Sequence, residues 1–123
     1  EDANNVSGGQ KQRLALAVNL VADKDIYVFD EATSNIDIES EAIIMDNIKA
    51  MSKNKSVIVI SHRLANVVPA DNIYYMEEGE VKERGSHAQL MSAQGGYAKL
   101  FNTQKALEEG YKEITGATAE VRA

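Results

Sequence analysis

The stretch Ile26-Tyr27-Val28-Phe29-Asp30-Glu31 is the part of this sequence that says most about its architecture. Its first four residues are β-branched, aromatic or aliphatic, without alternation between apolar and polar side chains. A short run of this kind is typical of a parallel strand that is buried on both faces. We therefore predict a buried strand over residues 26–29, with Asp30 and Glu31 at its carboxyl end.

The residues that follow this strand alternate between helical and strand-like patterns. Ile44, Ile48 and Met51 recur at helical spacing, which predicts a helix over residues 38–51. The apolar run at residues 56–60 then predicts a second buried strand. Strand, helix and strand in this order form a βαβ unit, in which the two strands are parallel.

Further elements are predicted on both sides of this unit. Ser7 and Gln10 have the spacing of a capping box at the start of a helix. Downstream we expect a short helix at 63–68, strands at 72–76 and 80–84 that form a hairpin, a short helix capped by Ser86 and Gln89, and a helix from Gly96 to about Leu107. The polar residues from Glu108 onward are expected to fray. The fold class is therefore α/β, with parallel strands, flanking helices and a C-terminal hairpin.

Composition narrows the class of protein. The 123 residues carry a formal net charge of −6 and no cysteine, which excludes disulfides and thiolate metal sites. An acidic chain without a basic patch argues against nucleic-acid binding but is compatible with one bound nucleotide. No apolar run approaches the ~18 residues that span a bilayer. The polar start, without Met, leads us to expect a piece of a longer protein.

Three candidate site residues lie at the carboxyl ends of the two predicted parallel strands. Asp30 and Glu31 end the first strand and His62 follows the second, and ligands of such sheets bind beyond the carboxyl ends of the strands. Carboxylates there suit Mg²⁺ and the activation of water. Taken alone, the two acids fit an ordinary acidic turn equally well. A lone histidine is more often structural, and we interpret His87 in that way.

Ser7-Gly8-Gly9-Gln10 is a candidate anion-binding motif. Two glycines in a first helical turn each cost roughly 1 kcal/mol of helix stability relative to alanine, but they leave backbone N–H groups uncovered. Such groups at a helix N-terminus attract a phosphate. Without other motifs, a capped helix start after a flexible turn is the favoured interpretation. Arg63 could pair with an acid, and its role stays open.

Together these motifs resemble the ATP-binding domain of ABC (ATP-binding cassette) transporters. The matching segments, in order, are the signature motif at residues 6–13, the Walker B strand and its glutamate at 26–31, the D-loop at 34–37 and the switch-histidine loop at 60–64. The resemblance covers about residues 4–103. It departs from the family pattern at Val6, where leucine is usual, and at Asn35-Ile36, where the D-loop usually has Ala-Leu.

The resemblance implies a RecA-like P-loop NTPase fold and a role for each motif. By this resemblance Asp30 would hold Mg²⁺ through water, Glu31 would be the general base, and His62 would contact the γ-phosphate of ATP. The ATP held by a second ABC ATPase domain would be bound by Ser7, Gly8, Gly9 and Gln10. Asp37 would couple the two ATP sites. The family's P-loop, G-x-x-x-x-G-K-[ST], is absent, because the 123 residues contain no Gly-Lys dipeptide. We therefore expect residues 1–107 to be the C-terminal part of the ATPase domain, without its P-loop half, and residues 108–123 to be a polar tail.

The resemblance also implies a function. Ser61-His62-Arg63-Leu64 and the Gly85-Ser86-His87 segment are similar to exporter-type cassettes, in which the ATPase follows its membrane domain in one polypeptide. We expect this chain to be part of an ATPase that powers export and lies at the cytoplasmic face of the cell membrane. We expect its ATPase domain to pair with a second one, as a homodimer or a heterodimer. The alternative is part of a soluble, non-transport ABC ATPase. The 123 residues alone are expected to be soluble and inactive.

Overall fold

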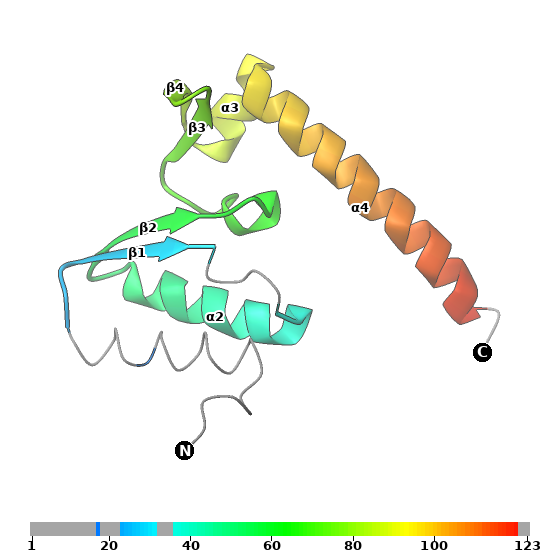
Figure 1. Ribbon diagram of the computed structural model, residues 1–123, viewed down its shortest axis with the longest axis horizontal. Helices are drawn as coiled ribbons and strands as arrows, with labels where there is room; N and C mark the ends of the chain where they lie inside the picture. Colours follow the sequence, from blue (N-terminus) through cyan, green and yellow to red (C-terminus); the bar gives the residue numbers. More distant parts are fainter. Residues whose placement is uncertain (1–16, 18–22, 32–35, 121–123) are drawn as a thin grey trace. The chain divides into compact units, whose positions relative to one another are not determined.

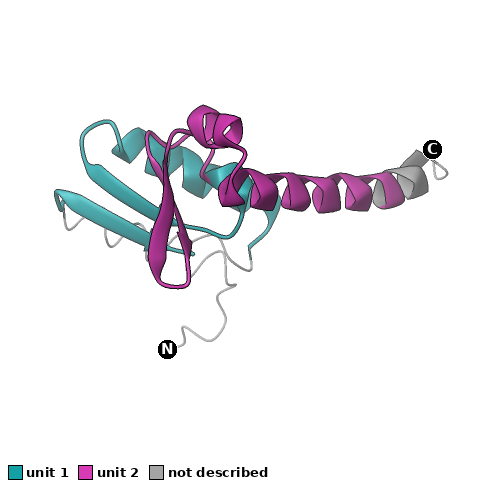
Figure 2. Cartoon of the chain, turned by 90° about the horizontal axis from the view of Figure 1, so that it is seen from above, with its two compact units in different colours: residues 1–66 teal, residues 67–123 magenta. Residues whose placement is uncertain are grey.

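The computed structural model describes Ala17, residues 23–31 and residues 36–120, with side chains as far as Ile114 (Figure 1). Its elements in chain order are β1 (Ile26–Asp30), α2 (Ile38–Met51), β2 (Ser56–Ile60), the 3₁₀ helix η2 (Leu64–Asn66), β3 (Ile73–Glu77), β4 (Glu80–Gly85), α3 (His87–Ala93) and α4 (Gly96–Glu120). The chain divides into two compact units, residues 1–66 and 67–123 (Figure 2). Whether residues 107 and 108 mark a further boundary stays a prediction.

The first unit contains the predicted βαβ arrangement. β1 and β2 pair in parallel, with Ile26 opposite Ser56 and Asp30 opposite Ile60. The helix α2 connects them and runs back along the sheet, so its N-terminus lies near the carboxyl ends of both strands (Figure 1). The predicted bounds of α2 and β2 are confirmed.

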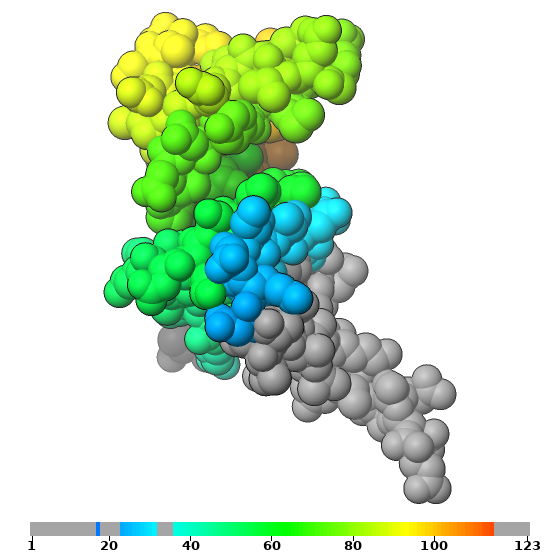
Figure 3. All heavy atoms as spheres, turned by 90° about the vertical axis from the view of Figure 1, so that its left-hand side faces the viewer, coloured from blue at the N-terminus to red at the C-terminus, as the bar shows by residue number. Residues whose placement is uncertain are grey.

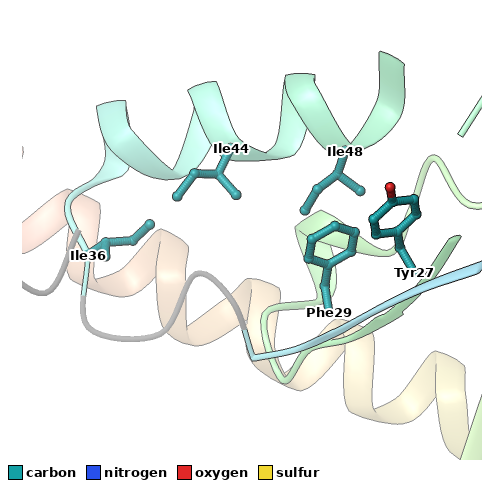
Figure 4. Close-up of a cluster of buried hydrophobic side chains, with 5 residues drawn as sticks. All are labelled: Tyr27, Phe29, Ile36, Ile44 and Ile48. Carbon is teal, nitrogen blue, oxygen red and sulfur yellow. The ribbon is translucent and has the colours of Figure 1, made fainter. Parts of the chain in front are cut away.

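The core of the first unit lies between α2 and one face of the strand pair (Figure 4). Its buried members are Tyr27, Phe29, Ile36, Ile44 and Ile48, with Met45, Met51, Val57 and Val59 packed around them. Strand residues two apart point to the same face, and helix residues four apart lie on one stripe, so the sequence pattern directs these side chains toward each other.

The other face of β1 and β2 is exposed, which contradicts the prediction of burial on both faces. Ile26, Val28, Ile58 and Ile60 retain 63%, 59%, 53% and 48% of their accessible surface. Residues of β1, drawn in blue, lie at the surface in Figure 3. Apolar composition shows that a strand face is suited to burial, but it does not show which element covers that face.

The second unit begins with the predicted hairpin. β3 and β4 pair antiparallel, from Ile73 opposite Gly85 to Glu77 opposite Glu80. Both turn residues, Glu78 and Gly79, have left-handed φ angles of 53° and 77°, as a type I′ hairpin turn requires. Within the described residues, β3 pairs with β4 and not with β1 or β2, so the described strands form two separate two-stranded sheets.

Two helices complete the second unit around its own core. Ser86 and Gln89 form the predicted capping box at the start of α3. The core contains Ile73, Leu90 and Tyr97, with Val67, Tyr75, Met91 and Phe101 packed against it.

The helix α4 does not end near Leu107 as predicted, because it continues to Glu120. Lys105 and Glu109 lie one turn apart on its surface, with 3.8 Å between Nζ and Oε1. Polar residues at this spacing are compatible with an exposed helix as well as with a frayed tail. Whether residues 108–123 are flexible stays a prediction.

Candidate functional site

The candidate site lies at the carboxyl ends of β1 and β2. Glu31 directly follows β1, and His62 is the second residue after β2. His62 Nδ1 lies 3.1 Å from Glu31 Oε1, within hydrogen-bonding distance, and both side chains are at least half exposed. The structure thus brings together the predicted general base and the predicted phosphate-contacting histidine, which are 31 residues apart in the chain.

The backbone of Glu31 has an unusual conformation. Its φ angle is 49°, a left-handed value that costs roughly 1–2 kcal/mol for a residue with a Cβ atom. Its N–H group donates to the carbonyl oxygen of Ile60 at 2.8 Å, which holds the turn against the end of β2. Backbone strain of this kind persists where the surrounding structure enforces it, and it concentrates at functional sites.

Asp30 is the last residue of β1, opposite Ile60, and it is exposed. Among the described residues no group of three His, Cys, Asp or Glu side chains could hold a metal ion. Mg²⁺ usually takes only one or two carboxylates from a protein, and phosphate oxygens and waters complete its shell. One exposed carboxylate therefore fits the donor chemistry of a magnesium ion bound together with phosphates.

Asp37 is the N-cap of α2. Its Oδ1 accepts the N–H group of Ser40 at 2.8 Å, and its Oδ2 accepts the Ser40 hydroxyl at 2.9 Å. The geometry accounts for Asp37 as a helix cap, which satisfies a free donor in the first turn. Its predicted part in coupling two ATP sites concerns a second subunit and stays a prediction. The predicted phosphate-binding residues Ser7, Gly8, Gly9 and Gln10 lie outside the described residues.

Arg63, whose role the sequence left open, forms an ion pair with Glu41 of α2. The second carboxylate oxygen of Glu41 accepts the side-chain amide of Asn66 at 2.9 Å. Sequence reasoning missed Glu41, although a signal was present. Glu41, Ile44 and Ile48 are spaced three and four residues apart, so this acid continues the apolar stripe of α2.

His87, predicted to be structural, contacts aromatic side chains of α4. Its Nδ1 lies 2.9 Å from the Tyr97 hydroxyl, and its ring packs on Phe101 with centroids 4.7 Å apart. Burial raises the pKa of the Tyr97 phenol above its ordinary value. These contacts support a structural role for His87 in the core of the second unit.

Comparison with known proteins identifies the family. Residues 1–34 match the family model described as ABC transporter. Over 113 residues the chain is 50% identical to an uncharacterized ABC transporter ATP-binding protein of Haemophilus influenzae, an alignment that covers 92% of this chain and 20% of that protein. The chain belongs to the ABC transporter ATP-binding family. The resemblance stated from the sequence motifs is thus confirmed.

Further matches are to proteins that transport substrates. The chain is 45% identical over 104 residues to the ATP-dependent lipid A-core flippases of Haemophilus ducreyi and Vibrio cholerae, covering 85% of this chain and 18% of each flippase. A solved structure of a bacterial Atm1-family ABC exporter with ATP bound matches with a TM-score of 0.75 and 37% identity, over 80% of this chain and 17% of that one. The likeness confirms the predicted α/β fold class. This ABC chain spans about a fifth of the length of these relatives.

Across the parts of the chain that the structure describes, no helix is both long and apolar enough to cross a bilayer.

Proposed function

We propose that this chain is part of an ATPase domain that powers the export of a substrate across a membrane. The observation that carries the proposal is the pair of Glu31 and His62, whose side chains meet at the ends of two parallel strands. The chain also resembles proteins named as flippases and as an exporter. In a parallel sheet this edge is where ligands bind.

Glu31 acts as the general base in the proposed reaction. Its carboxylate accepts a proton from the water that attacks the γ-phosphate of ATP, a contribution of typically 10²–10⁴-fold for a positioned base. Nδ1 of His62 lies beside Glu31, and Nε2, the other ring nitrogen, would contact a γ-phosphate oxygen. The 3.1 Å contact thereby fixes the base and the phosphate-binding imidazole relative to each other.

Asp30 is the residue that would hold Mg²⁺, directly or through water. The ion supplies charge neutralisation at the phosphates when it is bound. Asp30 and Glu31 are neighbours at the strand end, so one would hold the ion while the other receives the proton. The remainder of the chemistry is electrostatic positioning, as is usual for phosphoryl transfer.

The proposal includes partners that supply the missing parts of the site. The 123 residues contain no P-loop, so a P-loop must come from elsewhere in a longer polypeptide. A second ABC ATPase domain, identical or related, would receive Ser7, Gly8, Gly9 and Gln10 at its own ATP and contact Asp37. A transmembrane domain, in the same polypeptide, would place this domain at the cytoplasmic face of the cell membrane.

The reading frame upstream of Glu1 tests the assignment to export. Membrane-spanning segments encoded there support an exporter, whereas a second cassette without such segments supports the soluble alternative. The longer protein then tests the chemistry. Glu31→Gln keeps the shape of the side chain but removes the base, so ATP turnover should fall at least about 100-fold with ATP binding retained.

The exposed turn residue Glu78 provides a matched control, because Glu78→Gln makes the same change of charge in the second unit. Turnover that is unchanged by Glu31→Gln would refute the general-base assignment. The purified 123-residue chain should show no ATPase activity. Magnesium-dependent turnover by that chain would contradict the need for a P-loop supplied from elsewhere.

A further inference from the structure

The carboxylate of Glu41 is the centre of a small polar cluster beside the candidate site. Its side chain is only 12% exposed, although it lies in the first turn of α2. Its Oε2 accepts from the Arg63 guanidinium, and its Oε1 accepts from Asn66 Nδ2 at 2.9 Å. Both carboxylate oxygens are therefore paired, which is what a largely buried charge requires.

The two donors lie on the segment that follows His62. Arg63 is adjacent to His62, and Asn66 ends the 3₁₀ helix η2. The segment is also held internally, because the Arg63 N–H group donates to Ser61 Oγ at 3.0 Å and the Asn66 N–H group donates to the Arg63 carbonyl at 3.1 Å. One carboxylate on α2 thus holds a compact turn whose first exposed side chain is His62.

Glu41 also connects to the other predicted site segment. Its N–H group donates to the Asp37 carbonyl at 2.9 Å, the first backbone bond of α2. The Asp37 cap and the Glu41 contacts therefore lie in the same helical turn. A displacement of this turn would be transmitted to both the Asp37 segment and the His62 segment.

We infer that Glu41 is a positioning residue that holds His62 against Glu31 by anchoring Arg63 and Asn66. The inference rests on the proposed function for its catalytic consequence, but its structural part does not depend on ATP. Among the described residues the Glu41 carboxylate pairs with Arg63 and Asn66, so its role is positioning and not catalysis. It acts through the turn that carries His62.

The first test is nuclear magnetic resonance of the 123-residue chain. Glu41→Ala should shift the backbone amide signals of residues 61–63 and the ring signals of His62, while signals of the β3–β4 hairpin keep their positions. Glu41→Gln, which keeps the side-chain shape, should give smaller shifts at the same residues. Glu39→Gln removes a charge from the exposed side of the same helical turn and should leave residues 61–63 unshifted.

The second test is a double-mutant cycle on ATP turnover in the longer protein. Glu41→Ala should lower kcat at least tenfold with little change in KM for ATP. If Glu41 acts through His62, Glu41→Ala combined with His62→Ala should be no slower than His62→Ala alone, within about twofold. A purely structural contribution would instead multiply with the loss of His62.

Two results would overturn the inference. One is a Glu41→Ala chain whose His62 and 61–63 signals stay in place, or shift no more than in Glu39→Gln. The other is a cycle in which the two kcat losses multiply. If the unsubstituted longer protein hydrolyses no ATP, the proposed function falls, and the resonance shifts alone decide whether Glu41 positions His62.

Discussion

Gly96→Ala is expected to destabilise the second unit even though alanine favours helices. Gly96 is the first residue of α4 and packs against the ring of Tyr75. A Cβ atom added at Gly96 would lie 2.6 Å from Tyr75 Cε1 and 3.1 Å from its Cζ and hydroxyl oxygen. Contacts as short as the first of these require a shift, and Tyr75 is itself packed against the core formed by Ile73, Leu90 and Tyr97.

Two opposing effects set the expected magnitude. Replacing glycine by alanine inside a helix stabilises it by up to about 1 kcal/mol, and less at the first residue. Inserting a methyl group into a packed site costs about 1–3 kcal/mol, because side chains or backbone must move. The steric clash outweighs the gain in helix propensity, so we expect a net loss of about 1–2 kcal/mol in the free energy of unfolding.

Gly110→Ala is the matched control, since it makes the same substitution in the same helix. A Cβ atom at Gly110 meets nothing within 4 Å, so only helix propensity changes and stability should rise by up to about 1 kcal/mol. Urea unfolding followed by circular dichroism measures both changes. A Gly96→Ala chain at least as stable as the unsubstituted chain would refute the reasoning, because the clash of the added methyl group with Tyr75 would then not destabilise the fold.

Three further predictions concern the two cores and a helix cap. Ile44→Ala should lower the free energy of unfolding by about 2–5 kcal/mol, because the Ile44 side chain is only 2% exposed. The control Ile43→Ala should change the free energy of unfolding by less than about 0.5 kcal/mol, because Ile43 is 51% exposed. Ser86→Ala should cost about 1 kcal/mol by removing the capping box of α3, measured by the same urea titration. The raised pKa of Tyr97 means that the folded chain keeps this proton when the unfolded chain loses it, so stability should fall as pH rises above about 10. An absorbance titration of the tyrosines should show one that ionises late, and its persistence in Tyr97→Phe would contradict the assignment.

The sequence predicted the first unit well because its signals are local. An apolar run followed by acids, a helical stripe and a second apolar run are each complete within a few residues, and a βαβ connection leaves parallel pairing as the natural result. The bounds of α2 and β2 followed directly. The hairpin of β3 and β4 and the cap at Ser86 were likewise predicted from short local patterns.

What the sequence could not supply was the surroundings of each element. The residues of β1 suit burial on both faces, but whether Ile26 and Val28 are covered depends on elements that the strand itself does not encode. The end of α4 was misplaced for a related reason. Polar composition was interpreted as a frayed tail, but the helix continues to Glu120.

Glu41 shows how a position of this kind can be found from a sequence. The stripe of α2 contains Ile44 and Ile48, and one turn toward the N-terminus the same stripe contains an acid. A helix that follows a parallel strand runs back along the sheet, so its N-terminal turn lies at the carboxyl ends of the strands. A charge on the inward stripe at that turn needs a partner there, and Arg63 follows the neighbouring strand. The pairing of Glu41 with Arg63 therefore follows from helix periodicity and strand direction, two features that the sequence already predicted.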